Sequence, residues 1–121
     1  MWIKTIVIIY LYNKCSTCRE ALEFLENKKV VITVKEITKE PPVIAELQKM
    51  LDFHDGNVKK LLNTSGLLYR EMRLSEKLNT MSLAEVLALL NKNGMLVKRP
   101  FLIADHFGFT GFNAAAWSQR F

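Results

Sequence analysis

The chain holds two cysteines, Cys15 and Cys18, arranged as Cys-x-x-Cys where a strand pattern gives way to a helix pattern. Residues 3–12 are β-branched and aromatic, whereas residues 21–25 carry apolar side chains at helical spacing. The pair is therefore expected at a helix N-terminus, where unpaired N–H groups and the helix dipole favour a thiolate. We expect Cys15 to be the nucleophile and Cys18, one turn further on, to resolve an adduct at Cys15 as an intramolecular disulfide.

Three other interpretations of the cysteine pair are a structural disulfide, half of a zinc site, and two buried thiols without chemistry. A disulfide across so short a ring constrains the unfolded chain little. Zinc needs two further ligands, and the two histidines, His54 and His106, lie far apart in the sequence without a second cysteine pair. The sequence favours redox chemistry and predicts no metal and no bound cofactor.

Length and composition limit the class of protein. The chain has 121 residues, half of them hydrophobic, which indicates one domain spanning residues 1–121. Both cysteines belong to one motif, which fits a reducing compartment, so we expect a cytoplasmic monomer. The apolar run from Trp2 contains Lys4 and is too short for a signal peptide, and no stretch reaches the roughly 18 apolar residues of a membrane span.

The net charge of +5 suits an anionic substrate or an acidic partner. The basic residues are scattered and are not interleaved with aromatic side chains, so we expect no direct binding to nucleic acid.

The first half of the chain predicts a β-α-β unit. A helix is expected from an N-cap near Ser16 or Thr17 to about Lys29, followed by a second strand over residues 30–37. Such units have parallel strands with a right-handed connection. The cysteines then lie at the carboxyl edge of the first strand, where open α/β sheets bind their ligands.

The middle of the chain predicts only helices. Two prolines at 41 and 42 precede an apolar stripe over residues 43–53, and shorter helices are expected at 58–62 and 67–78. Ser82 and Glu85 have the spacing of a capping box, which opens a helix through Asn91. The sequence therefore predicts a helical insertion over about residues 43–94.

The last third of the chain predicts a β-hairpin and a closing helix. Residues 101–104 and 107–112 are apolar runs separated by a short turn, and a proline, Pro100, precedes them. The remaining residues form a short helix or cap with Trp117 and Phe121 on one side. The predicted class is α/β, a mixed four-stranded sheet with an all-helical insertion between strands two and three.

This order of elements resembles the thioredoxin fold, and individual residues are similar to the arsenate reductase and Spx family of bacterial proteins. The similarity covers nearly the whole chain, and the residues that carry it are Tyr12, Cys15, Cys18 and Arg19, the prolines at 41 and 42, residues 61–66 with Tyr69 and Arg70, residues 94–100, and Gly111 with Phe112.

The resemblance implies roles for residues around the cysteines. Pro100 is expected to follow a cis peptide bond and to face Cys15, with Asn13 as a second structural residue of the site. Arg99 is expected to direct its guanidinium toward Cys15 and to act in catalysis. The implied function is that of an arsenate-reductase-like thiol oxidoreductase, which takes electrons from an external thiol: glutathione, glutaredoxin or thioredoxin.

The sequence departs from the arsenate reductases of this family, which bind the oxyanion with three arginines. Asn63 stands where the first is expected, and no arginine occurs between Arg99 and Arg120. The alternative is a Spx-like, redox-sensing transcriptional regulator. Spx proteins bind the C-terminal domain of the RNA polymerase α subunit, and Gly56 falls in the corresponding loop.

Overall fold

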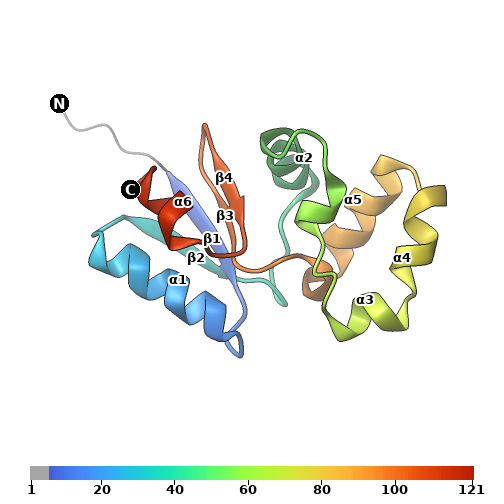
Figure 1. The fold of residues 1–121 in the computed structure, drawn as a ribbon, viewed down its shortest axis with the longest axis horizontal. Coiled ribbons are helices and arrows are strands. Elements are labelled where there is room, and N and C mark those ends of the chain that lie inside the picture. Colours follow the sequence, from blue (N-terminus) through green and yellow to red (C-terminus); the bar gives the residue numbers. More distant parts are fainter. Residues whose placement is uncertain (1–5) are drawn as a thin grey trace.

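The chain folds as a mixed β-sheet with helices on both faces (Figure 1). The computed structural model describes residues 6–121. In chain order, the elements of this part are β1 (Val7–Leu11), α1 (Ser16–Asn27), β2 (Ile32–Glu36), α2 (Ile44–Phe53), η1 (Val58–Leu61), α3 (Leu67–Glu71), α4 (Leu74–Lys77), η2 (Leu78–Thr80), α5 (Leu83–Lys92), η3 (Gly94–Leu96), β3 (Phe101–Ile103), β4 (Gly108–Thr110) and α6 (Ala114–Ser118).

The sheet of the described residues has four strands in the order β2-β1-β3-β4. β1 pairs in parallel with β2 and antiparallel with β3, and β3 and β4 form the expected hairpin. All the helices between α2 and α5 lie in the chain between β2 and β3. The predicted fold class, a thioredoxin-like mixed sheet with a helical insertion between strands two and three, is confirmed.

β1 has a partner on each side, and its alternating side chains divide the core in two. Val7, Ile9 and Leu11 pack with α1 and with Trp117 of α6. Ile8 and Tyr10 face the other way, toward the helical insertion. A strand with apolar residues on both faces needs a helical layer on each side. Figure 1 shows α1 and α6 on one side of the sheet and α2 on the other.

A polar contact joins the sheet to the insertion. The hydroxyl of Tyr10 donates to Oε1 of Glu46 in α2 at 2.5 Å. The same carboxylate oxygen accepts the backbone N–H of Val43, so Glu46 also caps the start of α2. The expected capping box of the later helix is confirmed, because Ser82 and Glu85 exchange hydrogen bonds.

The continuous helix predicted for residues 67–78 is wrong. Arg73 has φ +52°, a left-handed conformation that a right-handed helix cannot contain, and it separates α3 from α4. Tyr69 and Leu74 are both buried, but five residues along one straight helix place two side chains about 140° apart. The break lets both side chains enter the same core.

Several predicted boundaries extend too far. The first strand was expected over residues 3–12; β1 begins at Val7, and residues 3–5 lie outside the described part. α1 ends at Asn27 rather than Lys29, whose φ of +56° turns the chain toward β2. β2 has five residues instead of eight, because it is paired with β1 only over the length of that strand.

Candidate active site

Cys15 lies where the β1–α1 connection becomes helix. Its N–H donates to the carbonyl of Tyr12 at 3.1 Å, which closes the turn, and α1 begins at the next residue. The N-cap is therefore Cys15 itself, and the helix starts at Ser16, next to the N-cap as predicted. The Cys15 sulfur takes the place of a capping oxygen and accepts the backbone N–H of Cys18 at 3.3 Å. In this position the backbone N–H of Cys18 and the positive end of the α1 dipole both point toward the sulfur.

Cys18 has a different environment, although both cysteines are free thiols. Its side chain is 2% exposed, in the core between α1 and the sheet, whereas Cys15 is half-buried. Burial, with a smaller contribution from the hydrogen bond to Cys15, raises the pKa of Cys18 to about 12. Cys18 is thus held as a neutral thiol one helical turn from an accessible one.

This difference predicts the order in which the cysteines react. At neutral pH, iodoacetamide should alkylate Cys15 at least about a hundredfold faster than Cys18, because the buried thiol is neither ionised nor accessible. Peptide mass spectrometry over a time course measures both rates. Concentrated guanidinium chloride provides the control, in which the two rates should converge. Preferential labelling of Cys18 in the native protein would contradict the assignment.

Arg99 and Pro100 follow the helical insertion, and the expected cis peptide bond between them is present. The Arg99 guanidinium carbon lies 5.0 Å from the centre of the Tyr12 ring, and Nη1 donates to the Met95 sulfur at 3.3 Å. Its charge slightly lowers the pKa of Cys18, against the larger effect of burial. Arg99 is therefore close to the cysteine turn, while its direct contact with Cys15 stays a prediction.

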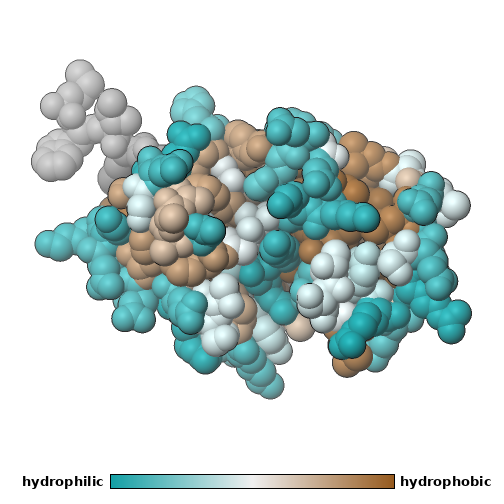
Figure 2. Space-filling view, viewed as in Figure 1, coloured by the Kyte–Doolittle hydropathy of each residue, from teal (hydrophilic) through white to brown (hydrophobic). Residues whose placement is uncertain are grey.

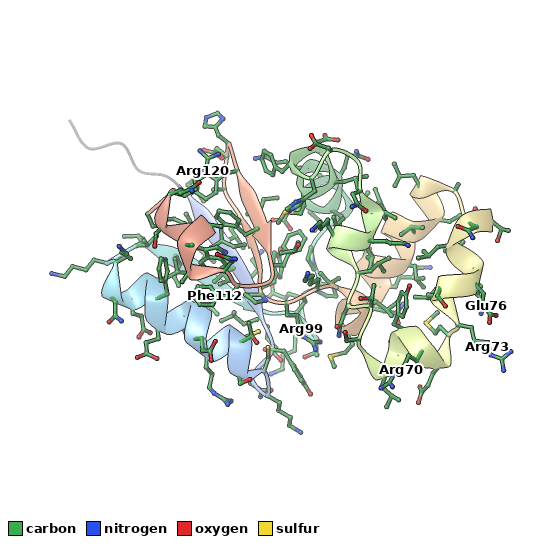
Figure 3. All side chains as sticks on the ribbon, in the orientation of Figure 1. Arg70, Arg73, Glu76, Arg99, Phe112 and Arg120 are labelled. Carbon is green, nitrogen blue, oxygen red and sulfur yellow. The ribbon has the colours of Figure 1, made fainter. Side chains whose placement is uncertain are left out.

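Arg99 lies nearer to the sheet than Arg70 and Arg73 do. In Figure 3, Arg99 lies between the sheet and the helical insertion, whereas Arg70 and Arg73 lie at the far end of the insertion. Asn63, which stands where an oxyanion-binding arginine was expected, is paired through its N–H with the carbonyl of Leu96 at 2.8 Å.

The two remaining predicted residues lie apart. Asn13 is exposed in the turn before Cys15 and helps to line a 230 Å³ pocket that also reaches Cys18. Gly56 lies in the exposed turn after α2, with φ +79° and no atom within 4 Å of an added Cβ. The structure brings Asn13 to the cysteine pair and places Gly56 on a separate surface of the helical insertion.

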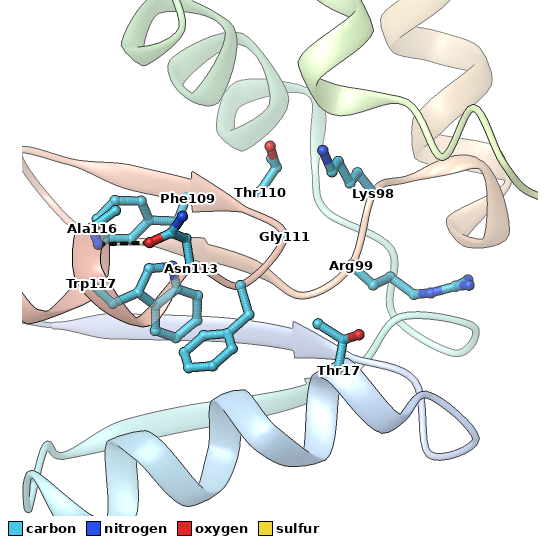
Figure 4. A pocket seen from close by; sticks show the side chains of 10 residues that line it. Thr17, Lys98, Arg99, Phe109, Thr110, Gly111, Asn113, Ala116 and Trp117 are labelled. Carbon is cyan, nitrogen blue, oxygen red and sulfur yellow. Dashed lines mark hydrogen bonds between the residues drawn. The ribbon is translucent and has the colours of Figure 1, made fainter.

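A groove of about 490 Å³ beside Arg99 was not predicted from the sequence (Figure 4). It runs from the start of α1 to the segment that joins β4 to α6. Its lining residues are Thr17, Lys98, Arg99, Phe109, Thr110, Gly111, Phe112, Asn113, Ala116 and Trp117. The sequence signals that could have found it are Lys98, next to Arg99 and Pro100, and the glycine at 111.

Residues 6–121 lack two kinds of feature. These residues have no helix long and apolar enough to cross a bilayer. They also contain no group of three or more histidine, cysteine, aspartate or glutamate side chains placed to hold a metal ion.

The fold and the site together define a class of protein. A β-α-β unit ends its first strand at a Cys-x-x-Cys helix, and a cis-proline precedes the hairpin that completes the sheet. This is the arrangement of thioredoxin-fold thiol proteins. Within that class, the chain belongs to the ArsC family, which matches residues 10–120.

The chain is similar to proteins of known sequence and of known structure. An uncharacterized protein of Bacillus subtilis, YusI, is 45% identical over 111 residues, which cover 92% of this chain and 94% of YusI. The global transcriptional regulator Spx of Streptococcus mutans is 25% identical over 88% of this chain and 77% of its own length. Among solved structures, a possible arsenate reductase from Streptococcus mutans is 35% identical, with a TM-score of 0.87 and coverage of 97% of this chain and 99% of that one.

Proposed function

We propose that the protein is a thiol oxidoreductase of the ArsC family, in which Cys15 is the nucleophile and Cys18 the resolving thiol. The observation that carries the proposal is the unequal pair: a half-buried Cys15 sulfur at the start of α1 accepts the N–H of Cys18, whose own thiol is buried one turn away. An attacking thiol must be accessible to the substrate, whereas a resolving thiol needs only to reach the sulfur of the first, so this difference in access suits the two roles.

The proposed reaction has two exchange steps. The Cys15 thiolate attacks one sulfur of a disulfide R–S–S–R; the new Cys15–S–R bond forms, and one thiolate RS⁻ leaves. Cys18 then loses its proton and attacks the Cys15 sulfur, which forms the Cys15–Cys18 disulfide and releases the second RS⁻. The protein is oxidised by two electrons and the substrate is reduced. An external thiol, such as glutathione, glutaredoxin or thioredoxin, returns the electrons by the reverse exchange in the cytoplasm.

Trapping the intermediate tests this function. In Cys18→Ala, the second step is blocked, so incubation with glutathione disulfide should leave one glutathione on Cys15, seen by intact mass. The wild-type chain should instead lose two protons and carry no adduct. Cys15→Ala is the matched control and should acquire neither change. An adduct on Cys18 in the Cys15→Ala protein, formed as quickly as the adduct on Cys15, would reverse the roles.

A second candidate is a Spx-like regulator that binds the RNA polymerase α subunit. Its support is the similarity to Spx proteins together with the exposed, left-handed Gly56 in an open turn. A tagged Cys18→Ala protein in bacterial lysate separates the candidates. Recovery of polymerase α subunit without a disulfide bond, and its loss in Gly56→Arg, would favour the regulator. Recovery of disulfide-linked partners would favour the oxidoreductase.

A further inference from the structure

Tyr12 is the residue that links Arg99 to the cysteine turn. It directly follows β1, where side chains alternate between the two faces of the sheet, so its ring lies on the same face as Tyr10 and packs against the core of the helical insertion. The Arg99 guanidinium carbon lies 5.0 Å from the centre of that ring. The carbonyl of Tyr12 accepts the N–H of Cys15 at 3.1 Å. The side chain of Tyr12 thus contacts Arg99, while its backbone closes the turn that carries Cys15.

Both side chains that hold Arg99 are neutral. The ring of Tyr12 stacks on the guanidinium, and the Met95 sulfur accepts from Nη1 at 3.3 Å. Within residues 6–121, no carboxylate forms a salt bridge with Arg99. Figure 3 places Arg99 between the sheet and the insertion, and Figure 2, in the same orientation, shows hydrophilic residues at the centre of this face. An aromatic ring and a thioether fix the position of the cation and leave its charge available to other groups.

The buried thiol of Cys18 is the group that needs a positive charge nearby. Burial, followed by the hydrogen bond with Cys15, raises its pKa to about 12, although the backbone of Tyr12 and the charge of Arg99 act in the opposite direction. Tyr12 and Cys18 line the same 230 Å³ pocket, so the residue that holds Arg99 is also a neighbour of this thiol. The two contacts of Tyr12 therefore join the cation to the sulfur that is hardest to ionise.

We propose that Tyr12 is a positioning residue for the resolving step: its ring holds the Arg99 guanidinium beside the cysteine turn, and the unpaired charge of Arg99 favours the thiolate form of Cys18. The proposal rests on the thiol oxidoreductase function and names the residues that govern its second step. Tyr12 acts through Arg99 and touches no reacting atom with its side chain. Since the guanidinium lies over the ring, the ring is required and the hydroxyl is not.

The charge of Arg99 acts after the first exchange step. In the mixed disulfide Cys15–S–S–R, Cys15 carries no negative charge, so it no longer opposes the ionisation of Cys18. Cys18 then releases its proton to water and attacks the Cys15 sulfur; the Cys15–Cys18 bond forms, the bond between Cys15 and the sulfur of R breaks, and RS⁻ leaves. The substrate disulfide accepts the two electrons, so no other oxidant is needed. A cation held beside the turn stabilises the attacking thiolate.

The test measures the two steps separately with the neutral reagent dipyridyl disulfide, which releases one absorbing thiopyridone in each step. Attack by Cys15 gives a first phase whose rate depends on reagent concentration, and attack by Cys18 gives a second phase whose rate does not. Stopped-flow absorbance at neutral pH follows both phases in the wild type, Arg99→Gln, Tyr12→Leu and Tyr12→Phe. Arg19→Gln is the control with the same loss of charge, because Arg19 borders the Cys18 pocket but is exposed on α1.

Arg99→Gln should slow the second phase by about tenfold, since a nearby positive charge favours a thiolate by about that factor or more. Tyr12→Leu should slow it by about fivefold, because the arginine then leaves its place beside the turn for most of the time. Met95→Leu removes the other contact of Arg99 at nearly constant volume and should slow it by about threefold. Tyr12→Phe keeps the ring and Arg19→Gln leaves Arg99 in place, so both should stay within about twofold of the wild type.

A double variant separates positioning of the arginine from damage to the turn. Tyr12→Leu should cause no further slowing in Arg99→Gln, because Tyr12 acts only through the arginine. Equal slowing by Tyr12→Leu with and without Arg99 would overturn the proposal, as would a wild-type second phase in Tyr12→Leu. Failure of the parent function gives a different result: the wild-type chain would show no second phase and would keep a thiopyridyl group on Cys15. That result would reject the resolving role of Cys18, and the positioning role of Tyr12 with it.

Discussion

Arsenate should be reduced with a kcat/KM below about 10² M⁻¹s⁻¹, at least a hundredfold under the ordinary enzyme range of about 10⁴ M⁻¹s⁻¹ or more. Two of the three arginines expected for oxyanion binding are missing, at position 63 and in the final hairpin. Each charge-assisted hydrogen bond contributes roughly 1.5–3 kcal/mol, so the loss of two is enough to lower kcat/KM by a hundredfold or more. A coupled assay with glutathione, glutaredoxin and glutathione reductase measures the kcat/KM for arsenate.

The structure gives a further reason for this expectation. The Arg99 guanidinium is engaged by Tyr12 and Met95, and Lys98 offers a point charge where the bidentate fork of arginine is needed for a tetrahedral oxyanion. The same preparation should exchange with disulfides, which shows that its thiols are active. An arsenate kcat/KM at or above the ordinary range would require another oxyanion site and would reject this account.

Local signals in the sequence were sufficient for the central features of the site. Cys-x-x-Cys between a strand pattern and a helix pattern placed Cys15 and Cys18 correctly at the start of α1, because two different periodicities meet there. The cis bond before Pro100 followed from resemblance to a family, since a proline in a sequence does not by itself reveal its isomer.

The features that the sequence did not predict depend on contacts between distant segments. The break at Arg73 is set by the need to bury Tyr69 and Leu74 in one core, and local helix propensity does not contain that requirement. The groove is formed by α1 together with the segment before β3 and the segment after β4, and some 80 residues or more of chain separate α1 from these two segments. The sequence alone therefore did not distinguish Lys98, which lines the groove, from the other scattered basic residues.

Gly94→Ala should destabilise the protein by roughly 3 kcal/mol or more, because its site has no room for a side chain. Gly94 is buried at the start of η3, and an added Cβ would overlap the carbonyl oxygen of Ile37 and lie 2.9 Å from its carbonyl carbon. Ile37 is itself fixed, since its N–H donates to Leu11 of β1 at 2.8 Å. Guanidinium chloride unfolding followed by circular dichroism gives the free energy.

Backbone packed against backbone cannot be relieved by a change of rotamer, so the segment from Gly94 to Pro100 would have to move away from the end of β2. Gly56→Ala is the matched control, because Gly56 has φ +79° and open space around its Cα. Its cost should be only the roughly 1–2 kcal/mol of a left-handed alanine. If the two variants lose equal stability, the close approach of η3 to Ile37 does not limit the fold. If Gly94→Ala loses clearly more, contact between these two backbones is what fixes the segment carrying Lys98, Arg99 and Pro100 against the sheet.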